Sequence, residues 1–396
     1  MRFLTAGESH GPLLTGILEG MPAGLVIDID RIQSDLDRRR KGHGRGARTT
    51  KIESDTVQIM SGVRGGVTLG SPITLLIENK DWKNWKSVMN PTGKAAGREV
   101  YRPRPGHADL AGGLKYGFSD LRNALERASA RETAMRVAIG SLARQYLDLF
   151  GVDILSHVVQ LGGIEAKPAV TLSGGALPGV LARLRSEVEA SPVRTADPAA
   201  GRRMVSRIEA AKVAGDTLGG VFEILVTGLL PGLGAFAQWD RKLDGRLAAA
   251  LMSIPAIKGV EVGLGFAASS KLGTEVHDPI LPATTKGSAT RYRRATNNAG
   301  GLEGGVTNGE PLVLRAAMKP ISTTMKGLPS VDIRTGKPET SSVERSDVCA
   351  LPAAGVVGEA VVALALADAW AEKFGGDTIE DTRAAVGAYV RLLKKR

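Results

Sequence analysis

Short apolar runs, partly alternating with polar residues, predict strands near the start of the chain. They occur at Gly24–Asp30, Thr56–Val63 and Pro72–Asn79. This pattern is typical of strands that bury at least one face. Between the first two runs, Ser34–Arg40 has the spacing of a short helix. The same criteria predict strands further along the chain at Val152–Leu161, Gly220–Gly228, Lys258–Gly265 and Pro311–Met318.

A period of three to four residues predicts helices elsewhere. The longest such stretch is Ser119–Phe150, where the recurring apolar positions are Leu121, Leu125, Ala128, Met135, Ala138, Leu142, Tyr146 and Leu149. Other helices are predicted at Pro178–Ala190, Leu243–Ser253, Gly358–Phe374 and Thr378–Lys394. Strands and helices come in groups and do not alternate regularly. This grouping favours an α+β fold over a doubly wound parallel sheet.

Nothing in the sequence divides the chain into separate domains. No Ser/Gly-rich or charged linker is present, and no short repeat recurs. We therefore expect one catalytic domain over residues 1–396. Residues 80–106 are polar and contain three prolines. We interpret this segment as an ordered functional loop, because long structureless loops inside a compact domain usually serve a function.

Composition narrows the class of protein. The chain has 396 residues, 43% of them hydrophobic, which is enough for a large core. The single cysteine, Cys349, excludes an intrachain disulfide and a cysteine metal cluster, as expected in a reducing cytosol. We expect no signal peptide. The most apolar stretch, Ala353–Trp370, is interrupted by Glu359 and Asp368, which favours a buried helix over a membrane span. We expect a soluble cytoplasmic protein that binds neither membrane nor metal.

A net charge of +11 indicates an anionic partner, either nucleic acid, a membrane surface or an anionic small molecule. The densest basic stretch, Asp37–Lys51, lacks the interleaved aromatic residues that stack on bases in single-strand binders. Its glycines Gly42, Gly44 and Gly46 suit a loop around an anion, with arginines that bind phosphate or carboxylate. A solvated basic loop is the alternative interpretation.

Familiar nucleotide-binding and hydrolase motifs are missing from the sequence. It has no Walker A motif, no H-E-x-x-H and no G-x-S-x-G. The segment GLGFAA at 263–268 matches a dinucleotide-binding turn, but the residues after it have no amphipathic helical pattern. We therefore expect no dinucleotide site there.

The segment GESHG at 7–11 is the first candidate for chemistry. Glycines bracket small polar residues, which is typical of a turn, and the enclosed His10 is one of only five histidines. Three long stretches resemble the signature motifs of the chorismate synthase family: GESHGPLLTGILEGMP at 7–22, ERASARETAMRVAIGSL at 126–142 and RSDVCALPAAGVVGEAV at 345–361. The resemblance continues in DLDRRRKGHGR at 35–45, RPGHAD at 104–109, NNAGGLEGGV at 297–306 and KPIST at 319–323. It covers nearly the whole chain.

The resemblance implies both a fold and a reaction. The fold would be a β-α-β sandwich of antiparallel sheets and helices. The reaction would be a 1,4-anti elimination of phosphate from 5-enolpyruvylshikimate 3-phosphate to give chorismate, the last common step of the shikimate pathway to aromatic amino acids. The family requires reduced FMN, because the C6 hydrogen of the substrate is only weakly acidic. The family also implies a homotetramer. The sequence leaves open whether the chain reduces its flavin with NADPH or relies on another reductant.

The same resemblance implies roles for individual residues. The expected acid–base residues are His10, which would protonate the departing phosphate, His107, which would protonate reduced flavin near N1, and Asp347. The expected substrate-binding residues are Ser9, Arg39, Arg45, Arg48, Ser129 and Arg131. The expected flavin contacts are Arg127, Ala128, Ser129, Pro255, Ala256, Gly304, Lys319, Pro320, Ile321, Ser322, Thr323 and Arg345. Arg39 and Arg45 are also counted among the cofactor contacts, since they match positions that hold NADPH in some members.

Several assignments stay open at this stage. The sequence does not decide which histidine serves phosphate and which serves flavin. Asp347 could accept a proton or simply form an ion pair with Arg345, and we expect His43, His157 and His277 to be structural or surface residues. Two other functions use the same features: a flavin-independent phosphate-ester lyase or transferase that uses these arginines, and an RNA-binding protein whose basic loop tracks a backbone.

Overall fold

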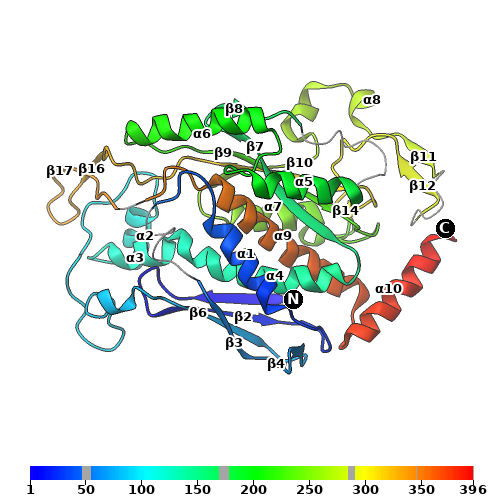
Figure 1. Ribbon diagram of the computed structural model, residues 1–396, viewed down its shortest axis with the longest axis horizontal. Helices are drawn as coiled ribbons and strands as arrows, with labels where there is room; N and C mark the ends of the chain where they lie inside the picture. The colour runs from blue at the N-terminus through cyan, green and yellow to red at the C-terminus, as the bar shows by residue number, and fades with distance from the viewer. Residues whose placement is uncertain (47–54, 169–177, 284–289, 345, 396) are drawn as a thin grey trace.

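Two antiparallel sheets face each other across a central layer of helices (Figure 1). The structure, a computed structural model, describes residues 1–46, 55–168, 178–283, 290–344 and 346–395. Side chains from both sheets and from the helices between them belong to one continuous hydrophobic cluster. The expected α+β class, with antiparallel sheets and helices in a β-α-β sandwich, is confirmed.

The first sheet has four strands in the order β1-β2-β6-β3. Its strands are β1 (Arg2–Ala6), β2 (Leu13–Glu19), β3 (Val57–Ser61) and β6 (Ile73–Glu78). In β6, Ile73, Leu75 and Ile77 are fully buried, whereas the residues between them are partly exposed. This two-residue period buries one face of the sheet against the helices.

The second sheet has five strands in the order β10-β15-β9-β7-β8. They are β7 (Asp153–Leu161), β8 (Ile164–Glu165), β9 (Gly220–Thr227), β10 (Ile257–Val262) and β15 (Leu312–Met318). The central strand β9 is buried on both faces. Ile224 and Val226 join the main core, while Leu225 belongs to a second cluster with Leu181 and Leu184 of helix α5 (Pro178–Ala190).

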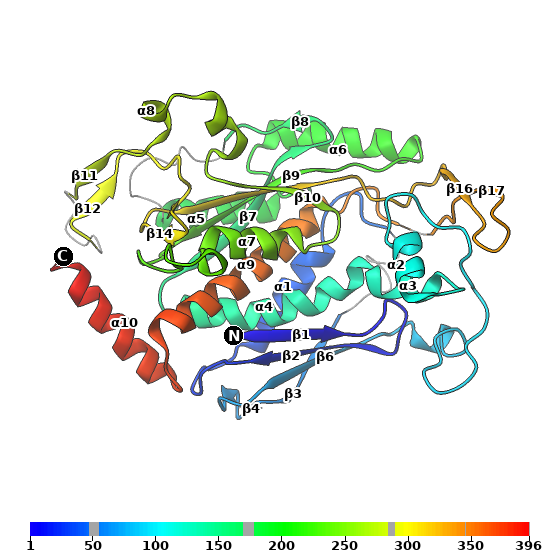
Figure 2. The ribbon, with the colours of Figure 1, turned by 180° about the vertical axis from the view of Figure 1, so that it is seen from behind.

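The helices α1 (Ile29–Arg40), α4 (Thr133–Asp148), α7 (Leu243–Met252) and α9 (Leu351–Phe374) form the central layer. Figure 2 shows α4 lying on β1, β2 and β6, and α9 lying between α4 and the second sheet. A Cβ atom at Gly140 of α4 would lie 2.5 Å from the Cβ of Ala360 in α9, so a glycine allows this close helix crossing. Among the described residues, α9 is the one helix long and apolar enough to cross a membrane, and 89% of its apolar window is buried in the fold.

The remaining elements surround this sandwich. The other helices are α2 (Asp109–Tyr116), α3 (Arg122–Ala128), α6 (Pro198–Val213), α8 (Gly273–Val276) and α10 (Ile379–Leu393), with short 3₁₀ helices η2 (Trp82–Asn84), η3 (Ala130–Glu132), η4 (Trp239–Arg241) and η5 (Gly265–Ser270). The short strands are β4 (Val63–Arg64), β5 (Val67–Thr68), β11 (Ile280–Pro282), β12 (Tyr292–Arg294), β13 (Leu302–Glu303), β14 (Val306–Thr307), β16 (Pro329–Val331) and β17 (Pro338–Thr340).

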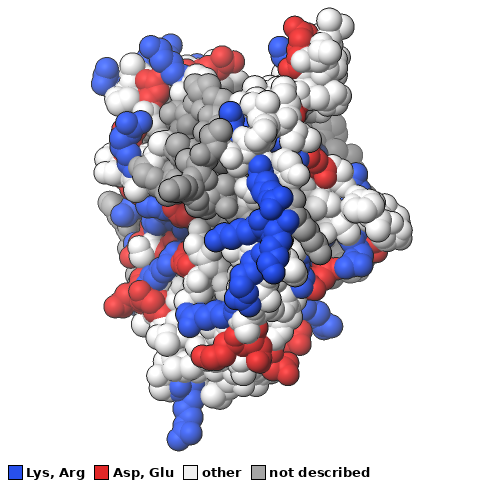
Figure 3. All heavy atoms as spheres, turned by 90° about the vertical axis from the view of Figure 1, so that its right-hand side faces the viewer, with Lys and Arg blue, Asp and Glu red and all other residues white. Residues whose placement is uncertain are grey.

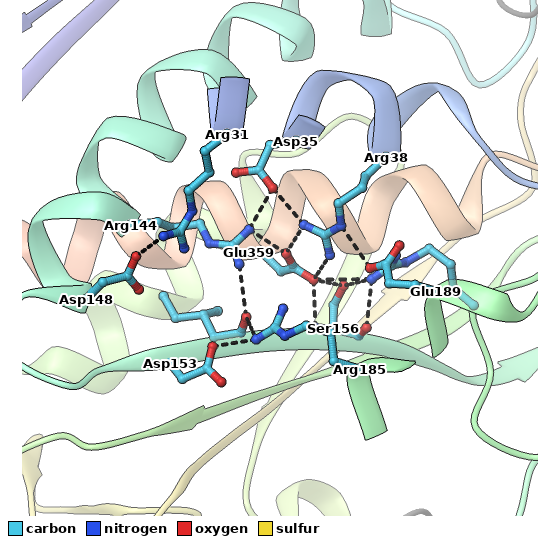
Figure 4. Close-up of polar contacts among 12 residues, drawn as sticks. Arg31, Asp35, Arg38, Arg144, Asp148, Asp153, Ser156, Arg185, Glu189 and Glu359 are labelled. Atoms are coloured by element: carbon cyan, nitrogen blue, oxygen red, sulfur yellow. Dashed lines mark hydrogen bonds and ion pairs between the residues drawn. The ribbon is translucent and has the colours of Figure 1, made fainter. Parts of the chain in front are cut away.

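A buried ionic cluster joins α1, α4, α9 and β7 around the carboxylate of Glu359 (Figure 4). Glu359 has no exposed surface. It accepts hydrogen bonds from Arg38 at 2.8 and 2.9 Å, from Arg144 at 2.9 Å and from the backbone and hydroxyl of Ser156, each at 2.8 Å. Burial by itself raises the pKa of Glu359, but the surrounding arginines outweigh it and hold that pKa well below its usual range.

The cluster is balanced in charge by further residues at its edge. Asp35 accepts from both Arg38 and Arg144, at 2.8 and 3.0 Å. Glu189 accepts from Arg38 at 2.8 Å and from Arg194 at 2.6 Å. Because α1 is tied to the other layers through Arg38, the position of the next residue, Arg39, is set as well.

Most predicted elements are confirmed with small shifts of their ends. The helix predicted at Ser34–Arg40 begins earlier, at Ile29, because the side chain of Asp28 caps it by accepting from the backbone of Arg31. The helix predicted from Gly358 begins at Leu351. The stretch Thr56–Val63 divides into β3 and β4.

Two predictions are wrong. Residues Gly24–Asp30 form no strand and have only isolated bridges, such as Val26 with Val67, before α1 begins. Leu25 and Ile27 are buried there although Val26 is 72% exposed, and the segment pairs only with the two-residue strand β5, through the single bridge Val26–Val67. The long helix predicted at Ser119–Phe150 is interrupted. It ends at Ala128, Ser129 has an extended conformation, and η3 leads into α4.

Some elements had no sequence prediction. Strands β1 and β2 lie on either side of the GESHG turn, where the pattern indicated only an apolar run. Helix α6 was also missed. The glycine-rich segment at 263–268 leads into η5 and not into an α-helix, as expected for a segment that is not a dinucleotide-binding turn.

Candidate active site

A cavity of about 690 Å³ opens beside the N-terminal end of α9 and the break between α3 and α4. Its wall brings together segments that are far apart in the sequence. The sequence-predicted residues that line it are Ser9, His10, Arg39, Arg45, His107, Ala128, Ser129, Arg131, Pro255, Ala256, Lys319, Ile321, Ser322, Thr323 and Asp347. The size lies within the range of about 300–1,000 Å³ that is usual for small-molecule and cofactor sites.

The segment GESHG is both a turn and part of this site. The amide of Gly11 donates to the carbonyl of Glu8 at 3.1 Å, which closes the turn. Two residues of the turn dock on Glu126 of α3. The amide of Ser9 donates to the Glu126 backbone carbonyl at 3.0 Å, and the amide of His10 donates to its carboxylate at 2.8 Å.

The interruption of the predicted long helix places polar groups at the cavity. Ser129, extended between α3 and η3, donates through its hydroxyl to the hydroxyl of Ser9 at 3.1 Å. Arg39 of α1 reaches the same break and donates to the hydroxyl of Thr133 and the carbonyl of Ala130, both at 3.0 Å. Arg131 forms an ion pair with the buried Asp55 at 2.7 Å. At this break the Ala130 carbonyl and the Ser129 hydroxyl both bond to side chains from other elements.

Asp347 forms an ion pair with an arginine of the basic stretch. Its carboxylate accepts from Arg45 at 2.5 Å and from the amide of Gly46 at 2.6 Å. The pair joins the basic stretch to the segment before α9, and both side chains line the cavity. The alternative pairing of Asp347 with Arg345 lies outside the described residues.

His107 has a buried carboxylate partner of its own. Its Nδ1 lies 2.5 Å from Asp109 Oδ1, and the side chain of Asp109 has no exposed surface. Arg104 donates to Asp109 at 2.8 Å and to the hydroxyl of Thr323 at 2.9 Å. Burial raises the pKa of Asp109, but His107 and Arg104 outweigh it and hold that pKa well below its usual range.

Another part of the cavity wall combines small side chains with a cation. Small side chains at the start of α9, Ala350, Ala353 and Ala354, line it. Ala256 has a φ of 71°, a left-handed conformation that is costly for a residue with a Cβ. Its carbonyl accepts from the amide of Lys319 at 3.0 Å, and the Lys319 ammonium donates to the carbonyl of Gly106 at 2.5 Å. An apolar wall with a fixed cation suits a flat, anionic cofactor.

Not every predicted residue lies in the cavity wall. Arg127 donates to the backbone carbonyls of Gly7 and Thr5, at 3.0 and 2.8 Å, and so supports the turn from outside. Gly304 lies between the short strands β13 and β14 and does not line the cavity. Pro320 lies between lining residues without lining the cavity itself. Arg48 and Arg345 lie outside the described residues.

The described part of the basic stretch faces inward. The side chains of Arg38, Arg39 and Arg45 are only 11%, 5% and 6% exposed, and they belong to the ionic cluster or the cavity. A solvated loop would expose them.

Exposed basic side chains gather elsewhere, in a stripe on the face where α10 lies (Figure 3). Helix α10 has Glu380 and Asp381 in its first turn and a basic residue in its last, which suits the helix dipole.

Sequence reasoning missed several residues that hold the site together. Glu126, Asp109 and Arg104 lie inside the motifs at 126–142 and 104–109, yet no role was assigned to them. The sequence feature that could have indicated their roles is a charged residue in the same motif as a candidate histidine, as in RPGHAD. Trp85 was also missed. Its ring stacks on His10 with centroids 3.6 Å apart.

Comparisons with known proteins agree with this site. A family model described as chorismate synthase matches residues 1–371. Chorismate synthase from Symbiobacterium thermophilum is 54% identical over 403 residues, and chorismate synthase from Trichlorobacter lovleyi is 56% identical over 399. Each match covers all of both chains. A crystal structure of chorismate synthase matches with a TM-score of 0.79 and 43% identity, covering 100% of this chain and 98% of that one.

The chain belongs to the chorismate synthase family. This confirms the resemblance seen in the motifs. It also identifies the chain as a lyase that acts on a carbon–oxygen bond to phosphate.

Proposed function

We propose that the chain converts 5-enolpyruvylshikimate 3-phosphate to chorismate and phosphate by 1,4-anti elimination, with reduced FMN, as the last common step of the shikimate pathway. Family membership supports the chorismate synthase activity itself. The observation that carries the finer proposal is one cavity that combines several arginines with two histidines, each backed by a buried carboxylate. These groups match a substrate with two carboxylates and a phosphate.

The arginines bind and orient the substrate. Arg39, Arg45 and Arg131 line the cavity and present planar guanidinium groups, which pair with carboxylates or phosphates through two parallel hydrogen bonds. Ser9 and Ser129 add hydroxyl donors beside them. We assign Arg48 to the same group from its place in the basic stretch Asp37–Lys51.

The part of the cavity wall with small side chains and Lys319 is the proposed flavin site. Ala128, Ala256, Lys319 and the segment through Thr323 would hold FMN, with the Lys319 ammonium near its negative charge. When bound, reduced FMN supplies electron density to the allylic system of the substrate as phosphate leaves. The apolar side chains at the start of α9 keep water away from that face.

The two histidines are the proposed proton donors. Imidazole has an ordinary pKa near neutrality, which suits a general acid in this pH range. His10 would hold a proton for the departing phosphate, and His107 would hold one for reduced flavin near N1. Asp347, fixed by Arg45 and Gly46, would receive the proton from flavin N5.

An anaerobic assay tests the proposal. The chain, the substrate and chemically reduced FMN should yield chorismate and phosphate, whereas a sample rigorously freed of flavin should yield neither. The variants His10→Ala, His107→Ala and Asp347→Asn should keep FMN and substrate affinity within about tenfold and lose about 10²- to 10⁴-fold in turnover. Phosphate release without flavin would favour the flavin-independent lyase instead.

The remaining parts of the proposal concern the state of the protein. We propose a cytoplasmic homotetramer, since the family implies it, and light scattering at micromolar concentration tests the tetramer. We also propose that Arg39 and Arg45 contact NADPH if the chain reduces its own flavin. Oxidation of NADPH by the purified chain with FMN alone, slowed in Arg45→Ala, would support this.

A further inference from the structure

The carboxylate of Glu126 holds the His10 imidazole from one edge. The Glu126 side chain has no exposed surface. His10 Nδ1 lies 2.9 Å from Oε1 and 3.0 Å from Oε2, and the His10 amide donates to Oε2 at 2.8 Å. Arg122, one turn earlier on α3, donates to Oε1 at 3.0 Å. The backbone and the ring of His10 are therefore bound to the same buried group.

An indole ring holds the imidazole from its face. The rings of His10 and Trp85 stack with centroids 3.6 Å apart and planes 27° apart. The indole nitrogen donates to Asp81 at 2.9 Å, which fixes the ring. The guanidinium of Arg98 lies 4.3 Å from the centroid of the same ring. Edge and face contacts together leave the imidazole little freedom to rotate.

We propose that Glu126 is a positioning residue that fixes the tautomer and the orientation of the His10 imidazole. The proposal rests on the acid role proposed for His10. A carboxylate at Nδ1 keeps a proton on that nitrogen, so Nε2 becomes the atom that gives or takes a proton in the cavity.

The other charged groups around His10 are arginines, each held in place by the contacts described below. Arg122 opposes the imidazolium, but it is engaged with Glu126 and, at 3.4 Å, with Glu344. Arg98 lies over Trp85, and Arg39 and Arg131 line the same cavity. Burial raises the pKa of Glu126, but His10 and Arg122 outweigh it and hold that pKa below its usual range, so the carboxylate is charged at neutral pH.

The chain contains a matched control. His157 Nε2 lies 3.0 Å from Glu223 Oε1, and Arg315 donates to the other oxygen of Glu223 at 2.8 Å. This is also a histidine–glutamate–arginine group, in which His157 and Glu223 are buried and Arg315 is 38% exposed, and none of its three residues lines the cavity. Glu223→Gln therefore reports the cost of breaking such a group in the fold, apart from any effect on His10.

The test compares Glu126→Gln with Glu223→Gln by two readouts. The first is imidazole ¹⁵N NMR of histidine-labelled protein across pH, in which the chain's five histidines give few signals. In the unmodified protein, His10 should be the Nδ1–H tautomer. That tautomer should give way to a mixture of both tautomers in Glu126→Gln, because a Gln amide can also donate to Nδ1, and it should persist in Glu223→Gln. An Nε2–H tautomer in the unmodified protein, or the same His10 tautomer in both variants, would overturn the proposal.

The second readout is the rate of single-turnover phosphate release with reduced FMN, measured together with FMN affinity. Glu126→Gln should lose about tenfold or more in rate with FMN affinity unchanged, whereas Glu223→Gln should keep both. If Glu126→Gln does not fold, the double variant Arg122→Met/Glu126→Gln removes both charges and takes its place. Normal turnover in His10→Ala would refute only the acid role of His10. The NMR readout would still decide whether Glu126 sets the tautomer of His10.

Discussion

Arg38 and Arg39 are neighbours in α1, yet they belong to two different arginine-rich regions. Arg38 lies in the ionic cluster of Figure 4, where three arginines share the carboxylates of Asp35, Glu189 and Glu359. Arg39 lines the cavity of about 690 Å³. Successive residues on a helix point about 100° apart, so one turn of helix serves both regions.

The two regions use the same residue type for opposite purposes. In the ionic cluster, Arg38, Arg144 and Arg194 point away from the cavity and bind carboxylates and backbone within the fold. In the cavity, Arg39, Arg45 and Arg131 are also tied to protein groups, but they face open volume that ligand oxygens can enter. Ion pairs inside the buried cluster hold the layers of the fold together. Ion pairs at the cavity wall orient an arginine so that its charge can meet a ligand.

The largest expected effect tests the cluster. Glu359→Gln should destabilise the fold by about 3–5 kcal/mol, because it leaves three buried arginines without their shared counter-charge. Denaturant unfolding would measure this. The control Glu187→Gln breaks an exposed pair with Arg183 and should cost less than about 1 kcal/mol. Equal losses in both variants would mean that the cluster does not hold the layers.

The next effect tests the cavity. Arg131→Ala should weaken substrate binding by about 2–3 kcal/mol, because a charged hydrogen-bonding group is lost from the site. FMN affinity should fall much less, and Arg131→Lys should recover part of the loss because it keeps the charge. Titration of each ligand separately measures both effects. If both ligands weaken equally, Arg131 organises the loop through Asp55 and does not hold the substrate.

Acid should weaken the cluster in a defined pH range. The pKa of Glu359 is lowered in the fold, so the unfolded chain binds more protons and stability falls as the pH drops below about 4.5, the ordinary value. Each pKa unit of this shift corresponds to about 1.4 kcal/mol. Unfolding free energy measured between pH 3 and 6 should therefore slope less steeply in Glu359→Gln than in the unmodified chain. Parallel slopes would contradict the assigned pKa direction.

The smallest effect concerns the cavity wall. Ala256→Gly should stabilise the fold by up to about 1 kcal/mol, because glycine adopts a φ of 71° without the steric cost of a Cβ. It should also loosen the hydrogen bond to the amide of Lys319 and lower FMN affinity slightly. Thermal unfolding and FMN titration measure the two changes. A less stable variant would show that Ala256 contributes packing that outweighs its backbone cost.

The sequence alone was sufficient to predict features that depend on residues close together in the chain. The two-residue period in β6 follows from the face that this strand buries, and the strand was predicted. Helix α4 was also predicted from its apolar spacing, although it is buried on nearly all sides. The motifs were sufficient for the family, and with it for about half of the residues that line the cavity. The prediction at Gly24–Asp30 failed because the strand that pairs with it, β5, is only two residues long and α1 already begins at Ile29, and a local pattern contains neither fact.

Only the tertiary structure decided which charged groups meet. His10 and Glu126 are 116 residues apart, and Arg45 and Asp347 are 302 apart. A periodic pattern places a side chain on a face, but it does not say which distant element packs against that face. The break in the helix at Ser129 also depends on distant parts of the chain. Ser9, Arg39 and Asp55 come from other elements and bond to the polar groups that the interrupted helix exposes.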